Sequence, residues 1–265
     1  MDRKIRIGAL ISGGGTNLLA IMDACESGGI HGRMVFVGSD RPDAAGLDRA
    51  RTRNIPTFTV DYRRIIDDYR VAPEAVLPPD DFDLEEILAK QSLFAPEADP
   101  GRVNRFFLTR AVAEARLMAA MAATPFDLLV LAGFMRNLTP YFIDRINTAA
   151  LKPRIMNIHP ALLPAFPGTD GYGDTFRYGC KVGGCTVHFV DYGEDSGPII
   201  GQRTVAVVPG ETLDAFRKKG LAAEWRLYPE CIQLFAQGRL QLVPRTRTLA
   251  DGEIINRWIV EILPQ

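Results

Sequence analysis

IRIGALISGGGTNLLAIMDAC, residues 5–25, holds three successive patterns that decide the fold. Residues 5–11 form an apolar run of strand length, and residues 12–17 form a turn with three consecutive glycines. Residues 18–25 then continue with apolar side chains at helical spacing. An apolar run that passes through glycines into an amphipathic segment predicts a strand, a tight turn and a helix.

The same alternation continues along the chain. Strands are predicted at residues 34–37 and 55–60, and a helix is predicted between them at residues 46–53. Because strands and helices alternate, the sequence predicts an α/β fold with a doubly wound, mainly parallel central sheet and right-handed crossovers.

The alternation returns in the second half of the chain. The further predicted strands are residues 127–132, 154–158, 186–190 and 199–208. Helices are predicted over residues 139–145 and 212–235, the second with a break near Gly220. We expect a single domain over residues 1–265, with a C-terminal tail after about residue 243.

Residues 63–124 depart from this regularity. Prolines and acidic clusters punctuate the segment, a short helix is predicted over residues 84–90, and a long alanine-rich helix over residues 103–122. We expect this insertion to be a peripheral layer of helices and loops that lies outside the reaction centre.

Composition narrows the class of protein. A chain of 265 residues with 47% hydrophobic and 24% charged residues has the balance of a globular protein with a sizeable core. A formal net charge of −1 gives no general attraction to nucleic acid or to anionic membranes. The sequence contains no signal-peptide pattern and no apolar run near the ~20 residues of a membrane span, so we expect a cytoplasmic protein.

The four cysteines do not form a ligand pattern. Cys180 and Cys185 are the two that lie close in sequence, and no CxxC motif or Cys/His set accompanies them. We therefore expect reduced thiols, no disulfide framework and no metal site.

Three unusual turns follow predicted strands, at residues 13–17, 133–136 and 157–160. In an open parallel sheet, ligands bind beyond the carboxyl ends of the strands, so these turns indicate a common site. The first turn leads directly into a helix, whose free N–H groups attract an anion such as phosphate. It is not a Walker loop, because no Lys-Ser/Thr follows the glycines, and it is not a GxGxxG motif, because Leu18 stands where the third glycine would be.

Two of these segments carry candidate catalytic side chains. Asn157 and His159 are two residues apart at a strand end, so their side chains project to the same face. An asparagine amide can stabilise an oxyanion and a histidine can move protons near neutral pH. Asp195 lies in the loop GEDSGP, where an aspartate is commonly a turn former. His188 and Arg136, taken alone, are better explained by structural or binding roles.

Together these segments resemble the folate-dependent formyltransferases. The resemblance rests on the motifs ALISGGGTNLLAIMDA, GLDRARTRNIP, DLLVLAGFMRNLTP, IMNIHPALLPAFPG, TVHFVDYGEDSGPII and EWRLYPECIQLFAQGRL. It covers most of residues 4–242, and the Asn-x-His-Pro motif with a downstream Asp-x-Gly-Pro is its most specific part.

The resemblance implies a Rossmann-type formyltransferase domain and a role for each site residue. It implies that the catalytic set is Asn157, His159 and Asp195, and that the substrate phosphate is held by Gly15, Thr16 and Asn17. It places the rest of the acceptor at Ile158, Pro160 and Glu224. It places the folate at Met135, Arg136, Asn137, Leu138 and the loop from Asp191 to Asp195.

The implied reaction is formyl transfer from 10-formyltetrahydrofolate to the primary amine of glycinamide ribonucleotide in purine biosynthesis, without a metal. Asn157 and protonated His159 would stabilise the oxyanion of the tetrahedral intermediate, and Asp195 would orient His159. The implied partners are these small molecules, without nucleic acid or membrane, and a homodimer remains open.

Two departures from the family pattern leave alternatives open. Residues 169–176 read TDGYGDTF where the family usually has histidines and a basic residue, and residues 63–124 are longer than its usual connection. The alternatives are a formyltetrahydrofolate hydrolase, a transferase acting on another amine, and a non-catalytic nucleotide or folate binder. The first two normally carry an additional domain, and the third would not need all three catalytic positions.

Overall fold

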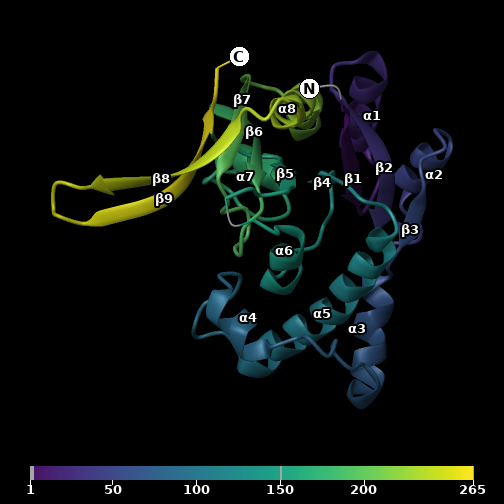
Figure 1. Ribbon diagram of the computed structural model, residues 1–265. Helices are drawn as coiled ribbons and strands as arrows, with labels where there is room; N and C mark the ends of the chain where they lie inside the picture. Colours follow the sequence, from purple (N-terminus) through teal and green to yellow (C-terminus); the bar gives the residue numbers. More distant parts are fainter. Residues whose placement is uncertain (1–2, 150, 265) are drawn as a thin grey trace.

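The computed structural model of the protein describes residues 3–149 and 151–264, and its centre is a seven-stranded sheet (Figure 1). The strand order is β3-β2-β1-β4-β5-β6-β7. The strands are β1 (Ile5–Ile11), β2 (Gly32–Ser39), β3 (Thr57–Thr59), β4 (Leu128–Leu131), β5 (Ile155–His159), β6 (Val182–Phe189) and β7 (Ile199–Ala206). Pairing is parallel from β3 to β5, and antiparallel from β5 to β6 and from β6 to β7. The prediction of a mainly parallel sheet is therefore confirmed.

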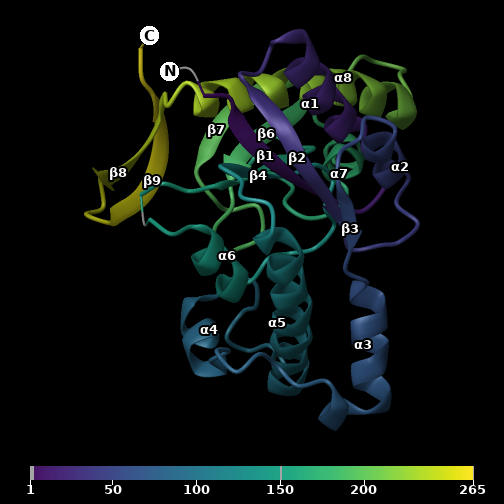
Figure 2. The ribbon, with the colours of Figure 1, turned by 45° about the vertical axis from the view of Figure 1, so that its right-hand side comes forward.

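Helices cover both faces of this sheet (Figure 2). They are α1 (Thr16–Ser27), α2 (Ala45–Arg51), α3 (Tyr62–Val71), α4 (Leu84–Lys90), α5 (Pro100–Ala122), α6 (Pro140–Ile146), α7 (Gly171–Arg177) and α8 (Leu213–Ala236), with a short 3₁₀ helix η1 (Pro73–Ala75). One core packs α1, α2 and α8 against the sheet through residues such as Leu18, Leu47 and Tyr228. The other packs α3, α5 and α6 against the opposite face through residues such as Ile65, Leu117 and Phe142.

The sheet order reverses between β1 and β4, which are neighbours in space although β2 and β3 lie between them in sequence. The two turns after these strands are bonded together: the Ser12 N–H donates to the Gly133 carbonyl at 3.0 Å, and the Met135 N–H donates to Ser12 Oγ at 2.8 Å. The point between β1 and β4 where the strand order reverses is the place where open α/β sheets bind ligands, beyond the carboxyl ends of the strands.

The long connection between β3 and β4 forms an arm that extends below the sheet in Figure 1. The predicted helices α4 and α5 are confirmed, whereas α3 was not predicted. Part of the arm has its own small core, built around Ile87 and Phe107. Phe94, Phe106 and Phe107 pack there edge to face, with ring centroids 5.0–5.8 Å apart.

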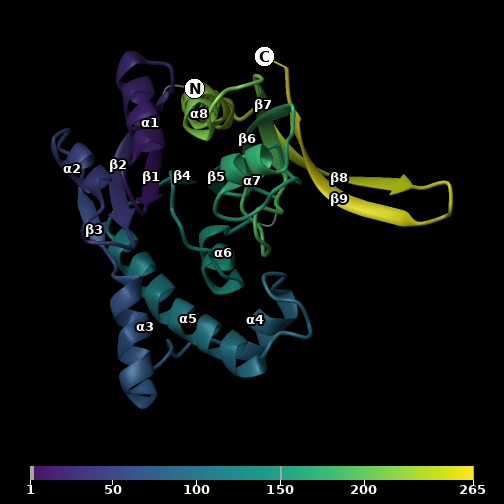
Figure 3. The same ribbon diagram turned by 180° about the vertical axis from the view of Figure 1, so that it is seen from behind.

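The C-terminal part differs from the sequence-based expectation in two ways. Helix α8 runs unbroken through Gly220 and Pro229. The tail forms a hairpin of β8 (Leu240–Thr248) and β9 (Ile254–Ile262), which projects away from the body (Figure 3). Of the helices within residues 3–149 and 151–264, none is long and apolar enough to cross a membrane.

Candidate active site

One cavity of about 470 Å³ lies beyond the carboxyl ends of β1, β4 and β5. All the residues that the sequence assigned to the site line it, except Tyr192 within the loop Asp191–Asp195, and their individual roles stay predictions. These residues are Gly15, Thr16, Asn17, Met135, Arg136, Asn137, Leu138, Asn157, Ile158, His159, Pro160, Asp191, Asp195 and Glu224. None of residues 63–124, all of which the structure describes, belongs to the lining.

Asn157 and His159 lie at the end of β5, and Asp195 reaches both from the loop between β6 and β7. His159 Nδ1 is 3.1 Å from one carboxylate oxygen of Asp195, and Asn157 Nδ2 is 3.5 Å from the other. His159 Nε2 lies 2.8 Å from the Phe166 carbonyl. Both ring nitrogens of His159 therefore face acceptors, an arrangement that favours the doubly protonated imidazolium.

The pKa of His159 is raised and the pKa of Asp195 is lowered. Burial alone lowers the pKa of His159, but the hydrogen bond and charge of Asp195, the Phe166 carbonyl and the charge of Glu224 together raise it above its usual value. Burial alone raises the pKa of Asp195, but the hydrogen bond and charge of His159, the nearby His188 ring and the Gly168 N–H hold it well below its usual range. The site is therefore built to keep a cation and an anion in contact.

His188 belongs to this cluster, although sequence reasoning gave it a structural or binding role. It pairs with Asn157 across β5 and β6, and its Nε2 lies 3.3 Å from Asn157 Nδ2. Because Nδ1 can donate to the Phe189 carbonyl at 2.9 Å, Nε2 is free to accept the Asn157 amide proton. His188 therefore fixes which way the Asn157 amide points. The sequence feature that could have pointed to this role is a histidine in the middle of the predicted strand TVHFV.

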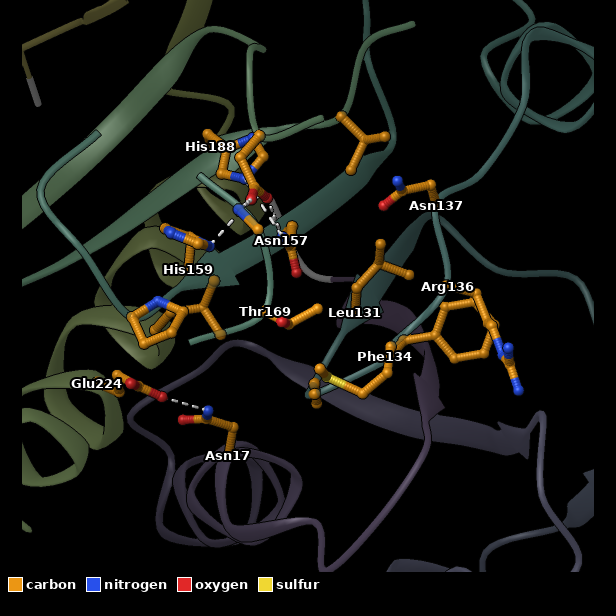
Figure 4. Close-up of a pocket in the computed structure, with 18 of the residues that line it drawn as sticks. Asn17, Leu131, Phe134, Arg136, Asn137, Asn157, His159, Thr169, His188 and Glu224 are labelled. Carbon is orange, nitrogen blue, oxygen red and sulfur yellow. Dashed lines mark hydrogen bonds and ion pairs between the residues drawn. The ribbon is translucent and has the colours of Figure 1, made fainter. Parts of the chain in front are cut away.

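The glycine turn forms the opposite end of the cavity (Figure 4). Gly15 is the N-cap of α1 at φ 68°, and no side chain caps the helix. A Cβ at Gly15 would lie 3.0 Å from the Gly46 Cα, so the turn also packs against α2. The N–H groups of the first helical turn have no intrahelical partner, and they point toward a site suited to an anion.

Figure 4 shows Asn17 joined to Glu224 on this side of the cavity. Asn17 Nδ2 donates to Glu224 at 2.6 Å, and the Tyr172 hydroxyl donates to the other carboxylate oxygen at 2.7 Å. Burial raises the pKa of Glu224, while these two hydrogen bonds oppose the rise. Asn17 Oδ1 is buried and has no protein partner among the described residues, so it is an acceptor available to a ligand.

Tyr172 comes from the stretch that departs from the family pattern. This stretch forms α7, which Asp170 caps by accepting the Gly173 N–H at 3.2 Å. The Tyr172 ring lies directly over α8, because a Cβ at Gly220 would come within 2.2 Å of Tyr172 Cζ. The unusual residues thus bring a buried tyrosine to Glu224, a contact that sequence reasoning did not identify.

The turn after β4 supplies the remaining wall. Met135 is 56% exposed there, and Arg136 pairs at 2.5 Å with Asp40, which is buried. Glu114 of α5 accepts from the Thr139 N–H at 2.8 Å and contacts the Thr139 hydroxyl, which anchors the end of the turn. Burial raises the pKa of Glu114 to about 8, while the hydrogen bonds that it accepts from Thr139 oppose the rise.

Comparisons with known proteins agree with this geometry. Residues 5–232 match the family model described as formyl transferase. The phosphoribosylglycinamide formyltransferase of Escherichia coli is 32% identical over 94% of this chain and 95% of its own length. The trifunctional purine biosynthetic protein adenosine-3 of Drosophila melanogaster is 31% identical over 92% of this chain, which spans 15% of that longer protein. The structure of glycinamide ribonucleotide transformylase 1 from Symbiobacterium toebii covers all of this chain, which in turn covers 96% of it, with 37% identity and a TM-score of 0.69.

Proposed function

The chain belongs to the formyl transferase family, and from that premise we propose that it transfers a formyl group from 10-formyltetrahydrofolate to the primary amine of glycinamide ribonucleotide. The observation that carries this proposal is the meeting of Asn157, His159 and Asp195 in a cavity whose far end is the open N-terminus of α1. One end can perform acyl transfer, and the other can hold a phosphate.

The acceptor occupies the side of the cavity formed by α1 and α8. Backbone N–H groups of Gly15, Thr16 and Asn17 bind its phosphate. The unpartnered Asn17 oxygen and the Glu224 carboxylate offer acceptors for its hydroxyl or amine groups. Ile158 and Pro160 contact the part of the acceptor that leads to the amine.

The folate occupies the side formed by the turn after β4 and the loop Asp191–Asp195. Leu138 is buried at this wall, whereas the exposed Met135 offers apolar surface to an aromatic ring. Asn137 Nδ2 lies 3.3 Å from Glu194, which links the turn to the loop across the folate side of the cavity. The folate binds as a co-substrate, and its formyl carbon is brought to Asn157 and His159.

In the reaction, the acceptor nitrogen forms a bond to the formyl carbon, whose carbonyl electrons move onto oxygen. The Asn157 amide and protonated His159 donate hydrogen bonds to this oxyanion. The His159 Nε2–H that meets the Phe166 carbonyl is the donor that the oxyanion takes over. The intermediate then loses a proton from nitrogen and expels N10 of the folate with a proton, leaving tetrahydrofolate and the formylated amine.

Incubation with 10-formyltetrahydrofolate, with and without glycinamide ribonucleotide, tests this assignment. Loss of formyl-folate only when the acceptor is present supports the transferase. Loss without any acceptor would identify a hydrolase, and the absence of turnover in both mixtures would identify a binding protein. The cytoplasmic location expected from the sequence is part of the proposal, and the free cysteines fit a reducing compartment.

Gly15→Ala is expected to raise the KM for the acceptor about tenfold, with a smaller effect on the folate KM, because a side chain strains the left-handed turn that presents the phosphate-binding N–H groups. The control is Gly28→Ala, which places a side chain on a similar left-handed backbone at φ 83°, at the opposite end of α1 and away from the cavity, without the close approach to Gly46. Equal increases in both KM values for Gly15→Ala would contradict the phosphate assignment.

A further inference from the structure

The arm formed by residues 63–124 does not line the cavity, but it contacts the loop that carries Asp195. The Ser92 N–H, just beyond the end of α4, donates to the Tyr192 carbonyl at 3.0 Å. A Cβ added at Gly193 would lie 2.8 Å from Ser92 Oγ, so the two backbones approach closely. The arm therefore reaches the catalytic loop from behind.

A chain of polar side chains strengthens this contact. The Tyr192 hydroxyl donates to one carboxylate oxygen of Asp144 on α6. The other oxygen accepts from Lys90 Nζ at 2.7 Å, and Lys90 also donates to Glu86 at 2.5 Å. Asp144 and Tyr192 are partly buried, whereas Lys90 and Glu86 are exposed. We call Lys90, Ser92, Asp144 and Tyr192 the loop anchor.

The platform under the loop anchor is well defined. Asp83 caps α4 by accepting the N–H groups of Glu85 and Glu86 at 2.9 and 3.1 Å. Ile87 fixes the helix in the small core of the arm. Gln91 Oε1 accepts the N–H groups of the two residues after Ser92, each at 2.9 Å, and so holds the turn that follows the helix. Lys90 and Ser92 therefore occupy fixed positions.

Asp195 needs such support, because its backbone has φ 50°, a left-handed conformation that costs free energy for a residue other than glycine. The loop has internal bonds, with Asp191 accepting from the Ser196 hydroxyl at 2.6 Å and from the Gly193 N–H at 3.2 Å. These bonds shape the loop but do not attach it to another element of the fold. The loop anchor attaches it to α4 and α6.

We propose that the loop anchor positions Asp195 against His159, so that the arm is a positioning element of the reaction rather than a peripheral ornament. The inference rests on the proposed function, since it assigns the arm to the same catalytic centre. If it is right, a substitution in the loop anchor lowers kcat because it weakens the contact between Asp195 and His159.

A double-mutant cycle tests this route. Tyr192→Phe removes the hydroxyl that reaches Asp144, and Lys90→Met removes the ammonium while keeping the length of the side chain. Each is expected to lower kcat by about tenfold, because small displacements of a catalytic group are costly. In an Asp195→Asn background each should lower kcat by less than about twofold, since the group being positioned is already impaired.

The matched control is Arg70→Met, which removes a similar partly exposed ion pair with Asp67 on α3 of the same arm. This control should leave kcat unchanged in both backgrounds. Thermal unfolding of each variant shows whether the fold is retained. If Tyr192→Phe and Lys90→Met slow the Asp195→Asn enzyme as much as they slow the wild type, the loop anchor does not act through Asp195 and the inference is overturned.

A second readout does not depend on turnover. The chain has three histidines, His31, His159 and His188, so their ring resonances can be assigned by single substitutions and followed by NMR during a pH titration. The groups that face His159 are Asp195, the Phe166 carbonyl and Glu224, with His188 behind Asp195. Tyr192→Phe is expected to lower the pKa of His159, because it weakens the contact with Asp195 that raises this pKa.

The two readouts separate the two proposals. A lowered His159 pKa in a protein that does not formylate glycinamide ribonucleotide would support the loop anchor and contradict the proposed acceptor. An unchanged His159 pKa in Tyr192→Phe and Lys90→Met would overturn the loop anchor, whatever the substrate proves to be.

Discussion

Asn157→Ala should lower kcat by about 10²–10³ while changing the KM of either substrate little, because the lost amide donor serves the oxyanion and not the ground state. His188 holds one amide proton, with Nδ2 3.3 Å from its Nε2, while the second meets Asp195 only at 3.5 Å, so the oxyanion takes over this second N–H. Steady-state kinetics with both substrates varied measures the effect.

The matched control is Asn147→Ala. Asn147 accepts the Arg154 N–H at 2.8 Å before β5 and lies outside the cavity, so its loss should reduce thermal stability without slowing the chemistry. Near-normal turnover of a well-folded Asn157→Ala enzyme would remove Asn157 from the mechanism.

Asp195→Asn should lower kcat by about two orders of magnitude and move its pH dependence. Asparagine keeps the size of the side chain but removes the charge that raises the pKa of His159. The lowering effect of burial then dominates, so His159 loses its proton at a lower pH. Because the protonated form stabilises the oxyanion, the alkaline fall of kcat should begin at lower pH in the variant than in the wild type.

The pH profile of kcat, measured with both substrates saturating, checks this sign. The remaining groups that face His159, the Phe166 carbonyl and Glu224, are the same in both proteins. A lower kcat with an unmoved alkaline limb would show that Asp195 does not control protonation of His159. A limb displaced upward would contradict the electrostatic argument itself.

The parallel part of the sheet was predictable because its strands are apolar runs separated by turns and helices. The direction of β6 and β7 was not, since TVHFV has the same buried pattern whichever way its neighbour runs. Helix α3 was not predicted because five of its ten residues are charged (YRRIIDDYRV). The hairpin of β8 and β9 was not predicted because most of its residues are exposed on both faces, which leaves no clear apolar alternation.

Within the site, positions fixed by local geometry were predictable. Asn157 and His159 share a face because of strand periodicity, and Gly15 stands where a strand passes into a helix. His188 and Tyr172 acquire their contacts only through tertiary packing, from an antiparallel neighbour and from α7 against α8. The local sequence around His188 or Tyr172 does not indicate which element of the fold will pack against that residue.

The packing of Tyr172 on Gly220 restricts the order in which descendants of this protein can diverge. While the tyrosine is present, any side chain at position 220 would collide with its ring, since even a Cβ would lie 2.2 Å from Cζ. Glycine at 220 must therefore arise before tyrosine at 172 in an ancestral lineage, and must outlast it on the way back. The order of change at the two positions is therefore fixed by sterics, at the side chain that holds Glu224.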